Sequence, residues 1–333
     1  MLKKCLCFAV LVSLVYFASA SFAAPKYTWK ISHVRPAGAS VDKDIHWLAE
    51  KLAKDSDGRI ELKVFPASQL GDYGVVQERV SLGAIEMAVQ PFLPASDQAI
   101  QLVNLPYLVN NWNGVRKNYL SGTPFMNWMS EILAKQDIKI VAVWPVYFGG
   151  IATSKEPVEP GNPAASKGVK LRVPPAKSFE LMAETMNYQP TPLPFAEAFT
   201  AIQTGIVDGA LGSGAEGYYS NFRDVIKYYI PANTHFEQWF LIMNAELWDE
   251  LSDDDKKIVS EAGKAFEERR ISMMEAETAE QEKKLEDYGI KILRLSDEEL
   301  NVIAQKVREK VWPVVREIVG EKVFDEGKSK IVH

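Results

Sequence analysis

Hydrophobic and polar residues alternate in a way that predicts strands and helices in turn along the first part of the chain. Residues 27–34 alternate with the period of a strand, and apolar residues between 45 and 52 recur at helical spacing on one face. The pattern then predicts a strand over 60–64, a helix from about 73 to 83 and a strand over 86–89. Elements in this order predict an α/β fold.

Two stretches of the first half are echoed in the second half. Ile60–Pro66 and Val169–Pro175 share an apolar-x-Leu-basic-Val-x-Pro pattern, and Gly83–Val89 resembles Gly205–Leu211. Two short matches can arise by chance, but a true repeat predicts two similar α/β lobes. The length of the chain, 333 residues, also favours two domains over one.

The carboxyl-terminal part has a more helical character. Ser252 is a candidate N-cap, Gly289 is a candidate C-cap, and only Gly263 interrupts the helical pattern between them. One helix of about 36 residues, roughly 54 Å long, fits this span and is long enough to brace both lobes. Two shorter helices split near Gly263 are the alternative. A last helix is predicted from about 296 to 318, interrupted or kinked at Pro313.

The amino terminus has the layout of a secretory signal peptide, residues 1–23. Lys3 and Lys4 precede a mostly apolar run over 6–18, and a small-x-small pattern predicts cleavage after Ala23. A transmembrane anchor is the competing interpretation, but the run is shorter than the roughly 18 to 20 residues that span a bilayer. The mature protein is therefore expected outside the cytoplasm, in the periplasm.

Removal of this segment changes the chemistry of the chain. Cys5 and Cys7 are the only cysteines, so we expect no disulfide, thiol nucleophile or lipid anchor in the mature protein. Loss of Lys3 and Lys4 lowers the 38 basic residues to 36, and with 44 acidic residues the net charge becomes 36 − 44 = −8. This charge does not favour binding to nucleic acid or to an anionic membrane surface.

The sequence contains none of the common catalytic or metal-binding motifs. The histidines are His33, His46, His235 and His333, and HExxH, GxSxG and Walker A patterns are missing, so we expect no metal or cofactor. Residues 212–217 fit GxGxxG, but a lone match deep in the chain is weak evidence for a dinucleotide. A loop lining a ligand cleft is favoured, because glycines let backbone amides approach a bound group.

Arg172 is the binding residue that the pattern itself selects. In the strand 169–173 its side chain points away from the apolar face, and Pro174-Pro175 ends the strand directly afterwards. Open α/β sheets bind ligands at the carboxyl ends of their strands. A guanidinium group can bind a carboxylate through two parallel hydrogen bonds. A solvated surface arginine is the alternative.

Four motifs, in order along the chain, resemble those of a known family. They are residues 69–72 (QLGD), 105–107 (LPY), 168–174 (GVKLRVP) and 201–209 (AIQTGIVDG). Over nearly its whole mature length the chain is similar to the substrate-binding proteins of tripartite ATP-independent periplasmic (TRAP) transporters, the DctP type. The resemblance implies an α/β, two-lobed periplasmic binding protein, a clamshell, with a long carboxyl-terminal helix bridging both lobes.

The resemblance also implies residues of the binding site. Arg172 matches the arginine that binds the ligand's carboxylate in the family. Phe195 and Glu197 match a segment at the mouth of the second lobe, and Gln90 matches a cleft position.

Two segments depart from the family pattern. Residues 149–154 lack the second arginine of sialic-acid-binding members, and residues 208–213, with Gly212 and Ser213, lack the usual polar ligand contacts. We expect the glycines to leave space and the site to combine one anion clamp with an aromatic wall, which disfavours a sialic acid. The candidate wall residues, which are equally expected in a core, are Trp144, Tyr147, Tyr218, Phe236 and Trp239.

These inferences give an expected organisation and function. The first lobe is expected to hold residues 24–147 plus about 236–275, and the second 148–235 plus about 276–333. The expected function is capture of a small organic anion by a monomer, with a carboxylate favoured over a sulfonate or phosphate ester. The protein would deliver this ligand to a small and a large TRAP membrane subunit (DctQ and DctM type). The alternatives are a binding protein of an ATP-driven importer or sensor kinase, and a periplasmic enzyme.

Overall fold

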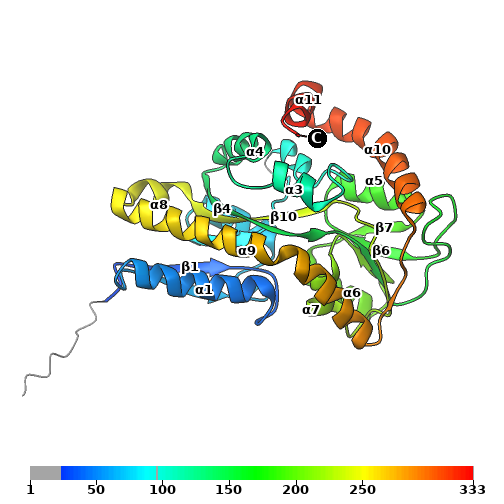
Figure 1. Ribbon diagram of the computed structural model, residues 1–333, viewed down its shortest axis with the longest axis horizontal. Helices are drawn as coiled ribbons and strands as arrows, with labels where there is room; N and C mark the ends of the chain where they lie inside the picture. Colours follow the sequence, from blue (N-terminus) through cyan, green and yellow to red (C-terminus); the bar gives the residue numbers. More distant parts are fainter. Residues whose placement is uncertain (1–23, 95–96, 333) are drawn as a thin grey trace, which may run out of the picture.

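Two β-sheets, each flanked by helices, make up the protein (Figure 1). The computed structural model describes residues 24–94 and 97–332, so the predicted signal peptide lies outside the described residues. The first sheet has the strand order β2 (Ile60–Phe65), β1 (Tyr27–Ser32), β3 (Met87–Gln90), β10 (Phe236–Asn244) and β4 (Ile138–Phe148). The second has the order β11 (Lys291–Ile292), β9 (Tyr228–Ile230), β5 (Ile151–Thr153), β8 (Gly209–Leu211), β6 (Lys170–Val173) and β7 (Gln189–Pro192).

We call each sheet with its covering helices a lobe. The helices of the first lobe are α1 (Ser40–Asp55), α2 (Tyr73–Ser81), the 3-10 helix η1 (Gln98–Leu102), α3 (Trp112–Asn118), α4 (Pro124–Ala134) and α8 (Ala245–Glu250). Those of the second are α5 (Lys177–Thr185), α6 (Phe195–Gln203) and α7 (Ala215–Phe222). Three further helices, α9 (Asp253–Asp287), α10 (Asp297–Val319) and α11 (Glu321–Ser329), follow them in the chain.

The two lobes repeat one topology, as the sequence predicted. Parallel strands lie in the order β2-β1-β3 in one sheet and β7-β6-β8 in the other, and the next strand is antiparallel in both. The match of Gly83–Val89 with Gly205–Leu211 is confirmed, because these segments lead into β3 and β8. The match of Ile60–Pro66 with Val169–Pro175 is wrong: the counterpart of β6 is β1. Alternating residues that end in proline are common to many half-buried strands, so this pattern does not show which strands of the two lobes are equivalent.

A single long helix, α9, connects the lobes. It has 35 residues, and its N-cap is the predicted Ser252, whose hydroxyl accepts a hydrogen bond from the Asp255 backbone N–H. The helix passes Gly263 without a break, so the split alternative is wrong. A Cβ at Gly263 would lie 2.8 Å from Cγ1 of Val141 on β4, and its absence lets helix and strand lie close. In Figure 1, α9 (gold) runs from α8 past α1 and β4 to α7.

The last two helices return the chain to the first lobe. The predicted helix with Pro313 is α10, which begins with a capping box between Ser296 and Glu299 and continues through the proline. It packs on α5 of the second lobe (Figure 1) and on η1 of the first, and α11 packs on η1 as well. Within the described residues, no helix combines the length and the hydrophobicity needed to span a bilayer.

Besides α9, the backbone crosses between the sheets at two places, and these two are bonded to each other. β4 pairs with β10 along its length, from Ile138 opposite Asn244 to Phe148 opposite Phe236. Beyond this ribbon, the Gly149 N–H donates to the His235 carbonyl (2.9 Å) and the Thr234 N–H donates to the Gly149 carbonyl (2.8 Å). We propose to divide the lobes at these crossings, close to residues 147 and 235.

Candidate ligand-binding cleft

Arg172 lies between the two lobes, at the carboxyl end of β6. Only 3% of its surface is exposed, so the alternative of a solvated surface arginine is wrong. Its Nε donates a hydrogen bond to the Leu193 carbonyl (2.9 Å), and a terminal nitrogen lies 3.5 Å from the Tyr73 hydroxyl of the first lobe. The guanidinium carbon lies 5.6 Å from the centre of the Phe195 ring. The guanidinium group therefore reaches the surface where the lobes meet.

A second buried arginine, Arg35, approaches the same ring from the first lobe. It follows β1, the counterpart of β6, and is 2% exposed. Its guanidinium donates to the Tyr147 hydroxyl, and its Nε lies 3.6 Å from a carboxylate oxygen of Glu216. The guanidinium carbon lies 4.7 Å from the Phe195 ring centre. Our sequence analysis missed Arg35, although the strand-end argument that selected Arg172 applies to it equally.

Arg35 keeps hydrogen-bonding capacity for a further partner. Its Nε and one terminal nitrogen are buried and form no hydrogen bond with the described residues. A buried donor without an acceptor costs free energy. The nearest counter-ion, Glu216, is itself disfavoured as an anion, because burial raises the pKa of its carboxyl group and Arg35 only opposes this rise. A bound anion would therefore accept the hydrogen bonds that these donors of Arg35 leave unmade.

Direct contacts hold the lobes together around this pair. Asp72, just before α2, accepts hydrogen bonds of 3.3 Å from the backbone N–H groups of Phe195 and Ala196, at the start of α6. A carboxylate is favourable at a helix amino terminus. Burial nevertheless raises the pKa of Asp72, and the positive charge of Arg172 acts in the opposite direction. The structure thus has the two lobes in contact, in a closed arrangement.

A small cavity lies between the lobes, next to Tyr73. It has a volume of about 40 Å³. The first lobe contributes residues 91–94 and part of η1 to its wall, and the second contributes Pro174 and Phe179. The polar side chains in the wall are those of Tyr73, Gln101, Asn104, Ser178 and Glu237.

Several of the predicted site residues gather around the two arginines. The rings of Phe195, Trp239 and Tyr147 lie 4.7, 5.1 and 6.0 Å from the Arg35 guanidinium carbon. Gln90 lies at the end of β3, and its side chain donates to the Tyr73 carbonyl (2.8 Å). Ser213 is buried beside Tyr147, and the backbone of Gly212 packs against Pro174 at the cavity wall. The structure therefore brings these residues together with Arg172.

Two predicted site residues lie elsewhere. Glu197 is exposed on the first turn of α6. Phe236 is buried on the opposite face of β10 from Trp239, because residues three apart on a strand point to opposite faces. It belongs to an aromatic cluster with Trp112, Tyr119 and Phe148.

Two of the candidate wall aromatics are core residues. Trp144 packs on Trp239 and donates its ring N–H to Asp44 (3.0 Å). Tyr218 donates to the backbone carbonyls of Gly150 and Ala210 inside the second lobe. Of the expected aromatic wall, only Tyr147 and Trp239 lie at Arg35, where the Phe195 ring joins them.

The glycines at the crossing do not leave space for a ligand. A Cβ at Gly149 would collide with the His235 ring, and a Cβ at Gly150 would lie 2.6 Å from the Ile230 carbonyl oxygen. These residues permit close packing of the backbone instead. The cleft also holds two buried guanidinium groups rather than the single anion clamp expected from the sequence.

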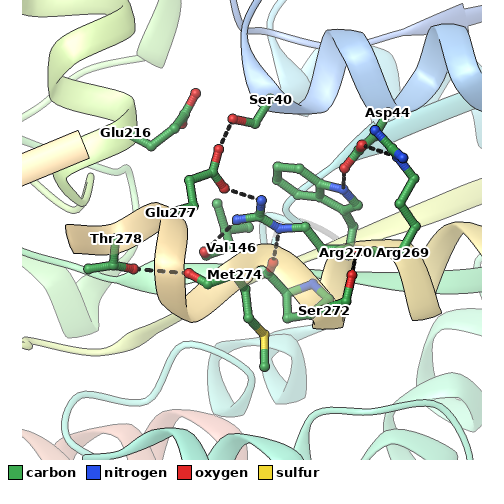
Figure 2. A network of polar contacts seen from close by, with 12 residues as sticks. Ser40, Asp44, Val146, Glu216, Arg269, Arg270, Ser272, Met274, Glu277 and Thr278 are labelled. Atoms are coloured by element: carbon green, nitrogen blue, oxygen red, sulfur yellow. Dashed lines mark hydrogen bonds and ion pairs between the residues drawn. The ribbon is translucent and has the colours of Figure 1, made fainter. Parts of the chain in front are cut away.

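A buried polar network ties α9 to the strand that leads into the cleft (Figure 2). Arg270 donates to the carbonyls of Pro145 (2.7 Å) and Val146 (2.8 Å) at the end of β4, and it pairs with Glu277. Glu277 in turn accepts a hydrogen bond from Ser40 at the start of α1. The network fixes the end of β4 directly before the tyrosine that contacts Arg35.

Comparison with known proteins gives consistent matches over most of the chain. The profile of the family described as bacterial extracellular solute-binding protein, family 7 (DctP), matches residues 31–321. A solute-binding protein of Roseobacter denitrificans is 26% identical over 328 residues, 94% of this chain and 97% of that protein. The C4-dicarboxylate-binding periplasmic protein DctP of Rhodobacter capsulatus is 26% identical over 228 residues, 68% of this chain and 67% of that protein.

Solved structures share the fold. A TRAP periplasmic solute-binding protein from Sulfurospirillum deleyianum, with bound succinate, aligns with a TM-score of 0.82 at 24% identity and covers 92% of this chain and 99% of its own. Another from Desulfovibrio salexigens, with bound orotic acid, aligns with a TM-score of 0.82 at 21% identity, covering 92% and 100%. Since the family profile spans nearly the whole described chain, this protein belongs to the DctP family, the bacterial extracellular solute-binding proteins of family 7.

Proposed function

We propose that this chain is the extracytoplasmic solute-binding protein of a TRAP transporter and that it captures a small organic carboxylate between its lobes. The observation that carries the proposal is the meeting of Arg172 and Arg35, from equivalent strands of opposite lobes, at one aromatic ring. Membership of the family supports it, as do solved relatives that hold succinate and orotic acid.

Binding and closure are coupled in this proposal. A carboxylate between the two guanidinium groups gains charge-assisted hydrogen bonds, which strengthen as water leaves the cleft. Contacts such as Asp72 with α6 form only when the lobes meet. The ligand therefore favours the closed form by its extra affinity for that form, and closure reports occupancy to the membrane partner.

Export and delivery complete the proposed role. The predicted signal peptide directs the protein to the periplasm, where it acts as a monomer and presents the ligand to a small and a large membrane subunit of the DctQ and DctM type. Genes for two such subunits found beside this one would support a TRAP system. Genes for an ATPase or for a sensor kinase would instead favour the rival binding-protein classes.

Substitution of Arg172 tests the proposal directly. The wild-type protein is melted with and without succinate, orotate and galactonate, and stabilisation by at least one of these acids is expected. Arg172→Ala should abolish that stabilisation, whereas Arg172→Lys should keep part of it, because lysine retains the charge and loses the planar fork. Arg116→Ala, at an exposed arginine paired with Glu275, serves as the matched control. Undiminished stabilisation of Arg172→Ala would refute the assignment.

One constellation favours the enzyme alternative on residue types alone. The Thr234 hydroxyl lies 3.0 Å from His235, which lies 3.0 Å from the Glu237 carboxylate. Nucleophilic catalysis requires the hydroxyl to face the substrate. Here Thr234 is fully buried at the crossing and Glu237 is the member that lines the cavity. The group at the cavity is thus the carboxylate and not the hydroxyl, so ligand binding is the better-supported function.

A further inference from the structure

Three side chains in the wall of the cavity next to Tyr73 offer hydrogen-bond acceptors to a ligand, those of Gln101, Asn104 and Glu237. Gln101, which is 4% exposed, has its side-chain oxygen buried and without a hydrogen bond from the described residues. The side-chain oxygen of Asn104, in the same wall, is also buried and accepts none from them. A buried acceptor of this kind lowers the free energy of the complex only when a donor reaches it.

The orientation of the Gln101 amide is set by its neighbours. Its nitrogen donates to the side-chain oxygen of Gln98 (2.7 Å). A flip of the Gln98 amide would turn its nitrogen toward Gln101, but it would also break the hydrogen bond that this nitrogen donates to the Pro94 carbonyl (2.9 Å), which can only accept. The oxygen of Gln101 is therefore the atom left for a ligand.

A negative charge stands in the same wall. The carboxylate of Glu237 lines the cavity and accepts hydrogen bonds from Trp239 (2.6 Å) and His235 (3.0 Å). Trp239 lies on the same strand as Glu237 and His235 directly precedes that strand, so the two partners hold the carboxylate in place. A second carboxylate of a ligand would meet this charge and the two amide oxygens. A hydroxyl or amino group would donate to them.

We infer, on the basis of the proposed function, that the ligand is a carboxylic acid that also carries hydroxyl or amino donors. Its carboxylate binds Arg172 and Arg35, and its donors bind Gln101, Asn104 and Glu237. Simple alkanoic acids, dicarboxylates without hydroxyl or amino groups and unsubstituted aromatic acids leave these acceptors unpaired. Sites built to bond a ligand hydroxyl discriminate strongly against the analogue that lacks it.

Matched pairs of acids test this inference by isothermal titration calorimetry. The pairs are gluconate with hexanoate, 4-hydroxybenzoate with benzoate, and 4-aminobutyrate with butyrate; the last pair separates amino from hydroxyl donors. In at least one pair the donor-bearing acid is expected to bind about 10- to 100-fold more tightly than its partner. Gln101→Met, which keeps the volume and removes the acceptor, should reduce that ratio by lowering the affinity for the donor-bearing acid alone. Gln305→Met, at an exposed glutamine on α10, is the control.

The outcomes separate this inference from the proposed function. If both members of every pair bind equally and both lose affinity in Arg172→Ala, the function stands and the donor requirement is wrong. If binding is independent of Arg172, the proposed function is wrong. If none of the six acids binds, the ligand carried through native purification is identified by mass spectrometry. A ligand identified as a compound with no hydroxyl or amino group besides its acid group would overturn the inference.

Discussion

Gly217→Ala on α7 tests whether the lobes close over a ligand as they do here. A Cβ at this position would lie 2.7 Å from a terminal nitrogen of Arg35 and 3.0 Å from the Tyr147 hydroxyl. Both atoms belong to the first lobe, whereas Gly217 belongs to the second, so these clashes arise only when the lobes meet. A third contact, 3.0 Å to Cβ of Ser213, lies within the second lobe and is present in both forms.

The expected magnitudes differ between the two forms. In the open form, replacing glycine by alanine in a helix gains about 1 kcal/mol, which the tight contact with Ser213 offsets in part. In the closed form, overpacking adds a cost of about 1–3 kcal/mol. Arg35 cannot easily yield, because it is enclosed by Tyr147, Phe195 and Trp239. Affinity should therefore fall by roughly 5- to 150-fold, while the melting temperature without ligand changes little.

The assay combines calorimetry with thermal melting. Titration uses the acid that stabilises the wild-type protein most, and melting without that acid reports the open form. Gly114→Ala on α3 is the matched control, because the atoms nearest to its Cβ would belong to Val109 and Asn111 of the same lobe. Unchanged affinity of Gly217→Ala would show that α7 and Arg35 stay apart in the liganded protein, and the closed arrangement described here would not be the binding form.

Three further predictions follow from buried groups. Arg35→Met should lower ligand affinity more than the double change with Glu216→Gln, because the single change leaves a carboxylate buried without its arginine when the lobes close; calorimetry compares the two variants, and equal affinities would contradict the pairing. Gly263→Ala should destabilise the protein by up to about 2 kcal/mol in urea unfolding, since overpacking against Val141 exceeds the helix-propensity gain; a stabilised variant would refute the close approach of α9 to β4. Burial raises the pKa values of Asp72 and Glu216 in the closed form, so this form binds protons more readily than the open form, and the contribution of these protons to affinity is lost as pH rises through the raised values; calorimetry in buffers of different ionisation enthalpy, at a pH just above the ordinary carboxyl range, should detect proton uptake on binding that is absent when both residues are amides.

The sequence pattern predicted local elements well and long-range pairing poorly. Strands β1 to β3 and helix α9 follow from periodicity and caps, and Arg172 follows from its place at a strand end. Arg35 meets the same strand-end criterion as Arg172, but only the strand order of the two sheets shows that β1 and β6 are counterparts. Phe236 was misplaced because its aromatic character says nothing of which face of β10 it occupies. Likewise, the tight packing of Gly149 depends on His235, more than 80 residues away in the chain.

The bonded crossing of β4 and β10 has a mechanical consequence. Flexible tethers would let two halves of a molecule tumble and twist independently. Here the passing strands are hydrogen-bonded to each other through Gly149 and residues 234–235, and one continuous helix of 35 residues spans the same joint. Three connections at one joint restrict how far one lobe can twist against the other. A receptor in the membrane would therefore meet this protein in a narrow set of shapes.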